Sequence, residues 1–302
     1  MKLPDYEPML ATPWPAPFDD EDWWFEVKWD GYRAIVGSSL GVMRARSRRG
    51  LDLLARFPEL VSLEIPDGVV LDGEIVAFDE LGRPSFSLIQ TRVEVNLVVF
   101  DVLFHGVDVT ARPYLERRGL LESLELPPPI IVPEPTPAHG VGLFEAVAAQ
   151  GLEGIVGKRR GSPYLPGRRT PDWRKIAVRH RLRAVVGGYL PGEGGRASTF
   201  GSVLVGLHTS EGLRWIGAVG SGFNEASLAA FSEALAQLKR PTSPFINRVV
   251  APGGPPVWVE PAIVIGVEYK EWTHDDHLRA PVYKGVDDTP PDQVTWEGER
   301  EG

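Results

Sequence analysis

The chain has no cysteine among its 302 residues. This absence excludes a disulfide framework, a thiolate zinc site and a cysteine nucleophile. No apolar run approaches the roughly 20 residues of a membrane span, and residues 1–14 lack the basic start and apolar centre of a secretory signal. We therefore expect a soluble, intracellular protein. Hydrophobic residues make up 43% of the chain, which suffices for a buried core and roughly two domains.

The charge of the chain is uneven. The net charge of -9, taken over the whole chain, argues against a partner with a phosphate backbone. Lysines and arginines nevertheless crowd residues 158–183, whereas acids dominate residues 287–301. A local basic face can bind an anion whatever the total charge, and a solvated basic loop explains the same composition equally well.

Residues 1–180 predict a mixed α+β domain. Short apolar runs there are typical of buried strands, namely residues 69–71, 75–78, 97–100 and 154–156. Apolar positions recur at helical spacing in residues 112–124 and 143–150. The strands are spaced too irregularly for a simple alternation of strand and helix.

Residues 181–288 predict a second, smaller domain. Short strands with glycine-rich turns are expected at residues 184–189, 203–207, 213–216 and 264–269. One amphipathic helix, residues 225–238, interrupts them, and residues 241–256 form a proline- and glycine-rich connection. This combination favours a small β-barrel such as an OB-fold. We expect residues 289–302 to form an acidic, weakly ordered tail.

The stretch EVKWDGYR, residues 26–33, places Lys28 between an expected strand end and an Asp30-Gly31 turn. On its own it is typical of a surface hairpin. Further clusters follow in the chain: LDGE at 71–74, a carboxylate after a strand and turn; FD at 100–101, the end of another strand; EGIVGKR at 153–159; and WRK at 173–175. Each cluster alone is a weak signal.

Together and in this order, these clusters resemble the nucleotidyltransferase motifs of ATP-dependent DNA ligases. The stretch SRRG, residues 47–50, resembles the motif that follows the lysine motif. The similarity covers nearly the whole chain, and it is greatest to the ligase domain of bacterial non-homologous end-joining ligases. Residues 167–175, 217–223, 271–273 and 278–281 also have counterparts there. The resemblance implies a nucleotidyltransferase (adenylation) domain followed by an OB-fold domain.

The resemblance makes Lys28 the nucleophile. Its amine would attack the α-phosphate of ATP, and the resulting lysyl-AMP would pass AMP to the 5′-phosphate at a DNA nick before the 3′-hydroxyl seals the strand. A free lysine is mostly protonated near neutral pH, because its pKa is about 10.4. Nearby cations, Lys158, Lys175 and a divalent metal, should disfavour the charged form of Lys28.

The same resemblance assigns the other site residues. Glu26 and Phe100 contact adenosine, Phe100 by stacking on adenine, and Glu74 holds the ribose hydroxyls or the metal. Glu153 binds Mg²⁺ or Mn²⁺. The expected phosphate contacts in the nucleotide pocket and at the nick are Arg33, Arg48, Lys158, Arg169 and Lys175. Contacts with DNA outside the pocket are expected from Arg159, Arg160, Arg168, Arg179 and Arg181.

Two departures from the family pattern concern cations. The motif that begins at Trp173 usually carries a second lysine, and Ala177 stands there. The family's Arg-x-Asp-Lys element aligns with residues 284–289, where the arginine and the final lysine are missing. Both losses should slow self-adenylylation most, because the charge that develops on pyrophosphate goes unmatched. Arg174, Arg179 or Lys284 are the candidates to compensate.

Other functions share part of this pattern. RNA ligation or mRNA capping uses the same lysyl-nucleotide chemistry, and a catalytically impaired nick-binding module would explain the missing cations. The expected partner is nicked duplex DNA, bound by a monomer that acts at the bacterial nucleoid in DNA repair. Polymerase or nuclease activities, and any end-joining proteins, are expected on separate chains.

Overall fold

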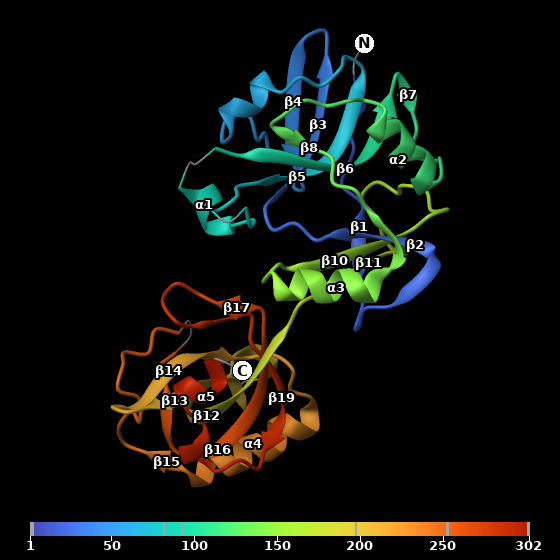
Figure 1. The fold of residues 1–302 in the computed structure, drawn as a ribbon. Coiled ribbons are helices and arrows are strands. Elements are labelled where there is room, and N and C mark those ends of the chain that lie inside the picture. Colours follow the sequence, from blue (N-terminus) through green and yellow to red (C-terminus); the bar gives the residue numbers. More distant parts are fainter. Residues whose placement is uncertain (1–2, 81, 92–93, 197, 252–253, 301–302) are drawn as a thin grey trace. The chain divides into compact units, whose positions relative to one another are not determined.

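The computed structural model describes residues 3–80, 82–91, 94–196, 198–251 and 254–300. The chain divides into two compact units, Met1–Val178 and Arg179–Gly302. Each unit has its own buried apolar core and its own sheets, which are coloured blue to yellow-green and yellow to red in Figure 1. The two units are described separately below.

The first unit contains two β-sheets. The larger sheet has the strand order β4-β3-β5-β6-β7, and β8 pairs with β6 outside this path. Its strands are β3 (Tyr32–Ser39), β4 (Val42–Ser47), β5 (Val69–Val76), β6 (Asn96–His105), β7 (Val107–Asp108) and β8 (Ile130–Ile131). The 3-10 helix η1 (Pro58–Ser62) and helices α1 (Phe86–Gln90) and α2 (Tyr114–Glu122) belong to the same unit.

The second sheet of this unit has the order β1-β11-β10-β2-β9. Its strands are β1 (Leu10–Pro13), β2 (Asp19–Val27), β9 (Thr136–His139), β10 (Gly154–Arg159) and β11 (Arg169–Ala177). Helix α3 (Gly140–Ala149) packs on this sheet through Val147, beside Phe25 and Ile155. The Asp19 carboxylate accepts a hydrogen bond of 2.9 Å from the Val141 amide and so supports the start of α3.

Lys28 lies in the turn that joins the two sheets. Strand β2 ends at Val27 in the smaller sheet, and β3 begins at Tyr32 in the larger one. Neither strand pairs with the other, so the turn is not the tip of a surface hairpin. At Gly31 the turn passes so close to β5 that an added Cβ would lie 2.1 Å from the Ile75 carbonyl oxygen, which only glycine permits.

Two expected strand ends are wrong. We expected a turn inside LDGE, but β5 runs unbroken from Val69 to Val76. The Asp-Gly pair is a turn signal only when its backbone is free to bend. Here Gly73 is held in the strand, where an added Cβ would lie 2.6 Å from the Val98 carbonyl oxygen of β6. Phe100 likewise lies in the middle of β6, which continues to His105.

The second unit is built on one six-stranded sheet of order β14-β13-β12-β16-β15, with β19 paired to β16. Its strands are β12 (His180–Pro191), β13 (Phe200–Thr209), β14 (Gly212–Val219), β15 (Lys239–Arg240), β16 (Val257–Tyr269) and β19 (Val282–Asp287). Strands β17 (Glu271–Trp272) and β18 (Leu278–Arg279) form a separate pair, and η2 (Gly194–Arg196) is a short 3-10 helix.

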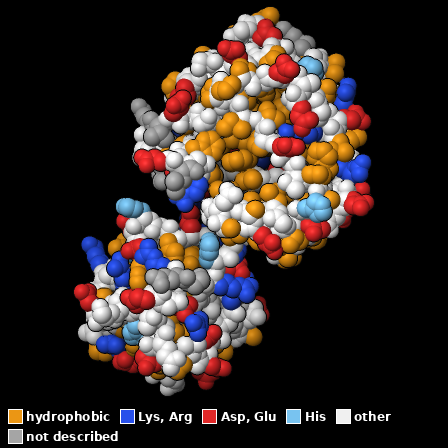
Figure 2. Space-filling model, in the orientation of Figure 1, with side chains coloured by type: hydrophobic (Ala, Val, Ile, Leu, Met, Phe, Trp, Pro, Cys, Tyr) orange, Lys and Arg blue, Asp and Glu red, His pale blue; other side chains and the backbone are white. Residues whose placement is uncertain are grey.

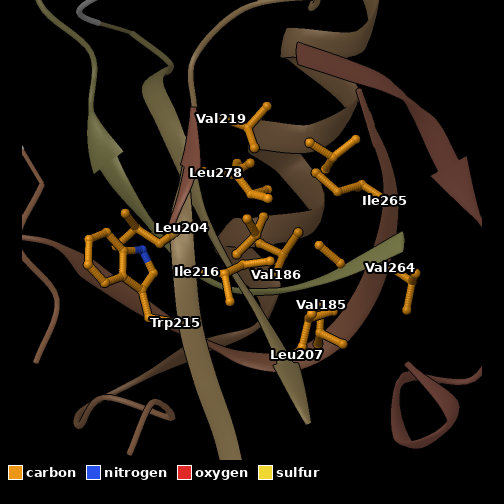
Figure 3. Packing of buried hydrophobic residues seen from close by; sticks show 14 of the residues in the cluster. Val185, Val186, Leu204, Leu207, Trp215, Ile216, Val219, Val264, Ile265 and Leu278 are labelled. Carbon is orange, nitrogen blue, oxygen red and sulfur yellow. The ribbon is translucent and has the colours of Figure 1, made fainter. Parts of the chain in front are cut away.

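Helix α4 (Glu225–Gln237) is the helix that we expected inside this unit. Asn224 caps it, because its side chain accepts a hydrogen bond of 2.8 Å from the Ser227 amide. The aliphatic core beside it combines residues from β12, β13, β14 and β16, and Figure 3 shows how Val186, Leu204, Ile216 and Ile265 meet there. The first unit has the mixed helices and sheets that we expected of an α+β domain, and the second has the expected β-rich architecture with one long helix.

The prediction of a weakly ordered tail is wrong for residues 289–300. This segment forms the 3-10 helix η3 (Pro291–Gln293) and helix α5 (Trp296–Arg300). Val294 is fully buried in the core of the second unit. The Glu299 carboxylate accepts hydrogen bonds of 2.6 Å and 2.7 Å from the Arg183 amide and guanidinium. The acids of this segment are therefore partly engaged in tertiary contacts, which the composition alone does not reveal.

Candidate active site

A pocket of about 220 Å³ lies in the first unit, between the two sheets. Nine of the ten predicted site residues line it: Glu26, Lys28, Arg33, Arg48, Glu74, Phe100, Lys158, Arg169 and Lys175. The tenth, Glu153, contacts the Lys28 ammonium group through its carboxylate. Residues 8–11, at the start of β1, form a further wall that sequence reasoning missed. In Figure 2, hydrophobic side chains gather with acidic and basic groups on the visible face of the first unit.

Two contacts attach Lys28 to the start of strand β10, one through its backbone and one through its side chain. Its amide donates a hydrogen bond of 2.8 Å to the Gly154 carbonyl, and its side-chain nitrogen forms an ion pair with Glu153. Gly154 has φ +140, and an added Cβ would lie 2.1 Å from the Ile176 carbonyl oxygen of β11. The glycine therefore lets β10 and β11 approach closely at the point where they hold the lysine.

Lys158 is fully buried and forms part of a charged network. It pairs with Glu26 at 2.8 Å and donates a hydrogen bond of 3.0 Å to the Phe100 carbonyl. The Tyr114 hydroxyl donates a 2.5 Å hydrogen bond to the same Glu26 carboxylate. Burial lowers the pKa of Lys158, and the Glu26 carboxylate opposes this shift. Of these partners, Tyr114 was not predicted, since an isolated tyrosine in α2 resembles any core residue.

A second network holds Arg33. Its guanidinium makes two hydrogen bonds of 2.6 Å with the buried Asp72 carboxylate, and the Tyr164 hydroxyl donates another of 2.6 Å to Asp72. The Tyr164 hydroxyl in turn accepts a 2.8 Å hydrogen bond from the Met9 amide in the pocket wall. Asp72, whose role the sequence left open, therefore orients Arg33, and Tyr164 is a further residue that sequence reasoning missed.

Glu74 lies at the pocket wall beside charged groups of both signs. Burial raises the pKa of its carboxyl to about 8, against the opposing attraction of Arg33 and Lys28. Burial therefore favours the neutral form of this carboxyl, which can donate a hydrogen bond. Among the described residues, no group of three or more His, Cys, Asp or Glu side chains is placed to hold a metal ion.

The ring of Phe100 is exposed by only 8% and lies between cations. The Arg33 guanidinium carbon is 4.5 Å from the ring centroid, and the Lys158 nitrogen is 4.7 Å from it. The predicted stacking on adenine is consistent with the position of Phe100 in the pocket lining. Contacts of this kind with a cation contribute about 0.5–1 kcal/mol when exposed and more when desolvated.

Replacing Phe100 with leucine should separate a stacking role from a packing role. We expect the ATP concentration for half-maximal self-adenylylation to rise about tenfold, because leucine keeps much of the volume and loses the flat face. The melting temperature should fall much less, since similar-volume core changes usually cost under about 1.5 kcal/mol. An unstable variant whose folded fraction binds ATP normally would instead make Phe100 a core residue.

The outer rim of the pocket is cationic. Arg48 and Arg169 are exposed, and the Arg169 guanidinium donates to the Ala11 carbonyl. Burial, followed by repulsion from Lys28, Arg169 and Arg48, lowers the pKa of Lys175. These three cations therefore lie near one another and near Lys28, as an anion-binding rim requires.

Arg174 does not share this rim. Alternate residues of a strand face opposite sides, and Lys175 and Trp173 line the pocket. The Arg174 guanidinium lies on the other side of β11, 3.8 Å from the Trp14 ring centroid and 4.2 Å from that of Trp23. Arg174 is therefore not placed to compensate for the lysine missing at Ala177.

The five arginines predicted to contact DNA outside the pocket are all exposed, and they divide between the units. Arg159 lies 3.8 Å from Asp172 in the first unit, and Arg181 lies 3.5 Å from Glu268 in the second. Exposed pairs of this kind hold the side chains weakly. Arg160 and Arg168 belong to the first unit, and Arg179 begins the second.

Two family models match this chain. The family described as "ATP dependent DNA ligase domain" matches residues 8–177, and "ATP dependent DNA ligase C terminal region" matches residues 196–289. The multifunctional non-homologous end joining protein LigD of Mycolicibacterium smegmatis is 38% identical over 97% of this chain. The chain spans about 40% of the length of that relative.

Solved structures of DNA ligases are similar to this chain in fold. The ligase domain of LigD from M. tuberculosis is 37% identical, covers 96% of this chain and 98% of its own, and superposes with a TM-score of 0.56. A mycobacterial DNA ligase D complexed with ATP and MES is 36% identical, covers 96% of this chain and 98% of its own, and has a TM-score of 0.55. A Lig E DNA ligase structure shares the fold, with a TM-score of 0.60 at 18% identity, over 93% of this chain and 99% of its own.

The fold and the family matches thus define a nucleotidyltransferase domain followed by an OB-fold domain. This chain belongs to the ATP-dependent DNA ligases, and its ligase-domain relatives are those of the bacterial non-homologous end-joining proteins. The predictions of an ATP-dependent DNA ligase and of its resemblance to end-joining ligases are confirmed. Within the described residues, no helix is both long enough and apolar enough to span a bilayer.

Proposed function

We propose that this chain seals nicks in duplex DNA through a lysyl-AMP intermediate on Lys28. The observation that carries the proposal is the position of Lys28 in the pocket, in contact with Glu153 and surrounded by the cationic rim. In the first step the Lys28 amine attacks the α-phosphorus of ATP. A nitrogen–phosphorus bond forms, the bond to the bridging oxygen breaks, and pyrophosphate leaves with the electron pair.

The attacking amine must be neutral, so its proton must be lost to solvent before the attack on ATP. The Glu153 carboxylate contacts the Lys28 nitrogen. We propose that Glu153 orients this nitrogen. Phe100 and the Glu26–Lys158 pair form the adenosine subsite, and Glu74 contacts either a ribose hydroxyl or the metal. Arg48, Arg169 and Lys175 bind the phosphates.

Glu153 and Glu74 also fit a divalent metal that arrives with ATP. Two carboxylates are too few for a preformed cage, but Mg²⁺ is commonly bound by one or two carboxylates with substrate phosphates and water completing its shell. Such an ion would neutralise charge on the triphosphate. We propose Mg²⁺ or Mn²⁺ in this role, held by Glu153 with Glu74 beside it.

The mass of the purified protein tests the proposed intermediate. A fraction heavier by one AMP, located on the peptide that contains Lys28, is the expected result after incubation with ATP and Mg²⁺. Incubation with GTP tests for a capping-type enzyme, and sealing of nicked DNA against nicked RNA tests for an RNA ligase. A protein that binds nicked DNA but never carries AMP would be a nick-binding module.

The missing cations lead to a kinetic prediction. Arg174 faces away from the pocket, and Lys284 pairs with Glu268 at 3.1 Å in the second unit. We therefore expect self-adenylylation to limit turnover, since a lost oxyanion-type contact costs about 2.7–4 kcal/mol in the step that needs it. Replacing Ala177 with lysine should accelerate adenylylation by about tenfold or more and change the sealing step little.

Single-turnover rates measure this difference. One reaction contains ATP and nicked DNA, and the other contains pre-adenylylated nicked DNA without ATP. Equal rates in the unmodified protein would contradict the prediction, because they would show that another cation already neutralises the leaving group. Ser210→Lys, a charge addition at an exposed position of the second unit, is the matched control.

For the cellular role, we propose DNA repair by end joining at the bacterial nucleoid. The support is the 34–40% identity to several LigD proteins across at least 91% of this chain. We propose that the ligase acts as a monomer and meets other end-joining proteins on the DNA.

A further inference from the structure

The sheet face that carries the nucleotide residues extends to a pair of exposed arginines. In the larger sheet, Arg46 of β4 is paired with Ile35 of β3, and Ile35 is paired with Asp72 of β5. Residues directly opposite one another on paired strands point to the same face of a sheet. Arg46 therefore lies on the same face as Asp72.

Two residues further along the strands, the next set of paired residues on this face also ends in an arginine of β4. Arg44 is paired with Gly37, and Gly37 is paired with Val70. Ile35 and Arg33, two and four residues before Gly37, lie on the same face of β3 because strand side chains alternate. This face bears Arg33 and Glu74 at the pocket and ends at Arg44 and Arg46 on the outermost strand of the sheet path.

The arginines at alternate positions of β4 form a series that leads toward the pocket. Arg44 and Arg46 are exposed, whereas Met43 and Ala45 between them are buried. Two residues along a strand span about 6.6 Å, which is close to the separation of successive phosphates along one nucleic acid strand. Arg48 follows β4 and lines the pocket, so cations lead from the nucleotide site outward along one edge.

Asp5 and Asp52 are acidic groups near this edge. Asp52 forms a β-bridge with Arg46, and its carboxylate accepts a hydrogen bond from the Leu54 amide. Asp5 lies 3.7 Å from Arg46, and the two side chains are exposed by 57% and 50%. Exposed pairs with this geometry are worth at most about 1 kcal/mol, and salt or a competing phosphate displaces them readily. Arg46 is therefore available to another anion at little cost.

We infer that Arg44 and Arg46 bind successive backbone phosphates of one DNA strand beside the nick. This inference rests on the proposed function, because the 5′-phosphate must reach AMP on Lys28 and its strand must then leave the pocket. Arginine suits the task, since its planar group donates two parallel hydrogen bonds to a phosphate. These two arginines lie outside the stretch, residues 158–183, in which the sequence predicted DNA contacts.

The test compares the double variant Arg44→Gln/Arg46→Gln with Arg112→Gln. Arg112 is another exposed arginine of the first unit and does not line the pocket. Binding to a nicked duplex is measured over a range of salt concentrations. Each phosphate contact contributes about 0.9 to the slope of log K against log [salt]. We expect the double variant to reduce the magnitude of the slope by about 1.8 and Arg112→Gln to leave it unchanged.

Self-adenylylation with ATP serves as the control for folding and for the pocket. Both variants should label Lys28 at the rate of the unmodified protein. An unchanged slope in a double variant that labels normally would overturn the inference, and so would an equal reduction in Arg112→Gln. If the double variant does not fold, each single variant should reduce the slope by about 0.9. Failure of the unmodified protein to acquire AMP would refute the proposed function instead.

Discussion

Replacing Lys28 with alanine should abolish the transfer of label from α-labelled ATP to the protein. The amine is the attacking atom in the proposed first step, and no rearrangement of neighbouring groups supplies it. The fold should remain, because the Lys28 side chain is 24% exposed and its amide hydrogen bond to Gly154 does not need the side chain. We therefore expect complete loss of labelling with a melting temperature within a few degrees of that of the unmodified protein.

A second substitution distinguishes the nucleophilic role of Lys28 from the role of its positive charge. Lys28→Arg keeps a cation beside Glu153 but replaces the amine with a weakly nucleophilic guanidinium, so this variant should also remain unlabelled. Lys239→Ala, an exposed lysine of the second unit, should label normally. Persistent labelling of Lys28→Ala at the unmodified rate would falsify the assignment and require another nucleophile.

Replacing Lys158 with methionine should destabilise the protein by about 3–5 kcal/mol, because it leaves a buried carboxylate without its cation. Lys158 is 1% exposed and its partner Glu26 is 7% exposed. After the substitution, Glu26 would retain the Tyr114 hydroxyl as a neutral donor. Unfolding in urea measures the loss, which should appear mainly as a lower midpoint with a similar slope.

Removing both charges tests the physical origin of this loss. The double variant Glu26→Gln/Lys158→Met should recover much of the stability, because no isolated charge remains in the interior. Arg279→Met, which breaks an ion pair with Glu271 whose two members are 44% and 43% exposed, should cost no more than about 1 kcal/mol. A double variant as unstable as Lys158→Met would show that packing of the lysine chain, and not charge, stabilises the pocket.

The pocket residues could be predicted because they carry chemistry that few other folds need. Lysine, glutamate and arginine have no packing role in an ordinary strand. Their order in the clusters from residue 26 to 175 matches one family. The residues that hold these side chains in place were not predicted. Tyr114 and Tyr164 hold Glu26 and Asp72 from sequence positions 88 and 92 residues away, and no local pattern encodes contacts at that separation.

Local signals also failed where tertiary contacts override them. Asp72-Gly73 is a turn signal in an isolated peptide, yet both residues lie in β5 between two neighbouring strands. The acidic end of the chain predicted weak order, but buried Val294 and the bonds of Glu299 hold it to the second unit. Helix α4 was predicted well because its amphipathic pattern is local.

The attachment of Lys28 to β10 has a mechanical consequence. Its backbone is bonded to Gly154, its side chain contacts the preceding residue Glu153, and β10 pairs directly with the strand of Lys175. Lys28, Glu153 and Lys175 are thus attached to adjacent strands of one sheet. We therefore expect any displacement of that sheet to move the three side chains together, so that their separations vary less than the position of any one of them.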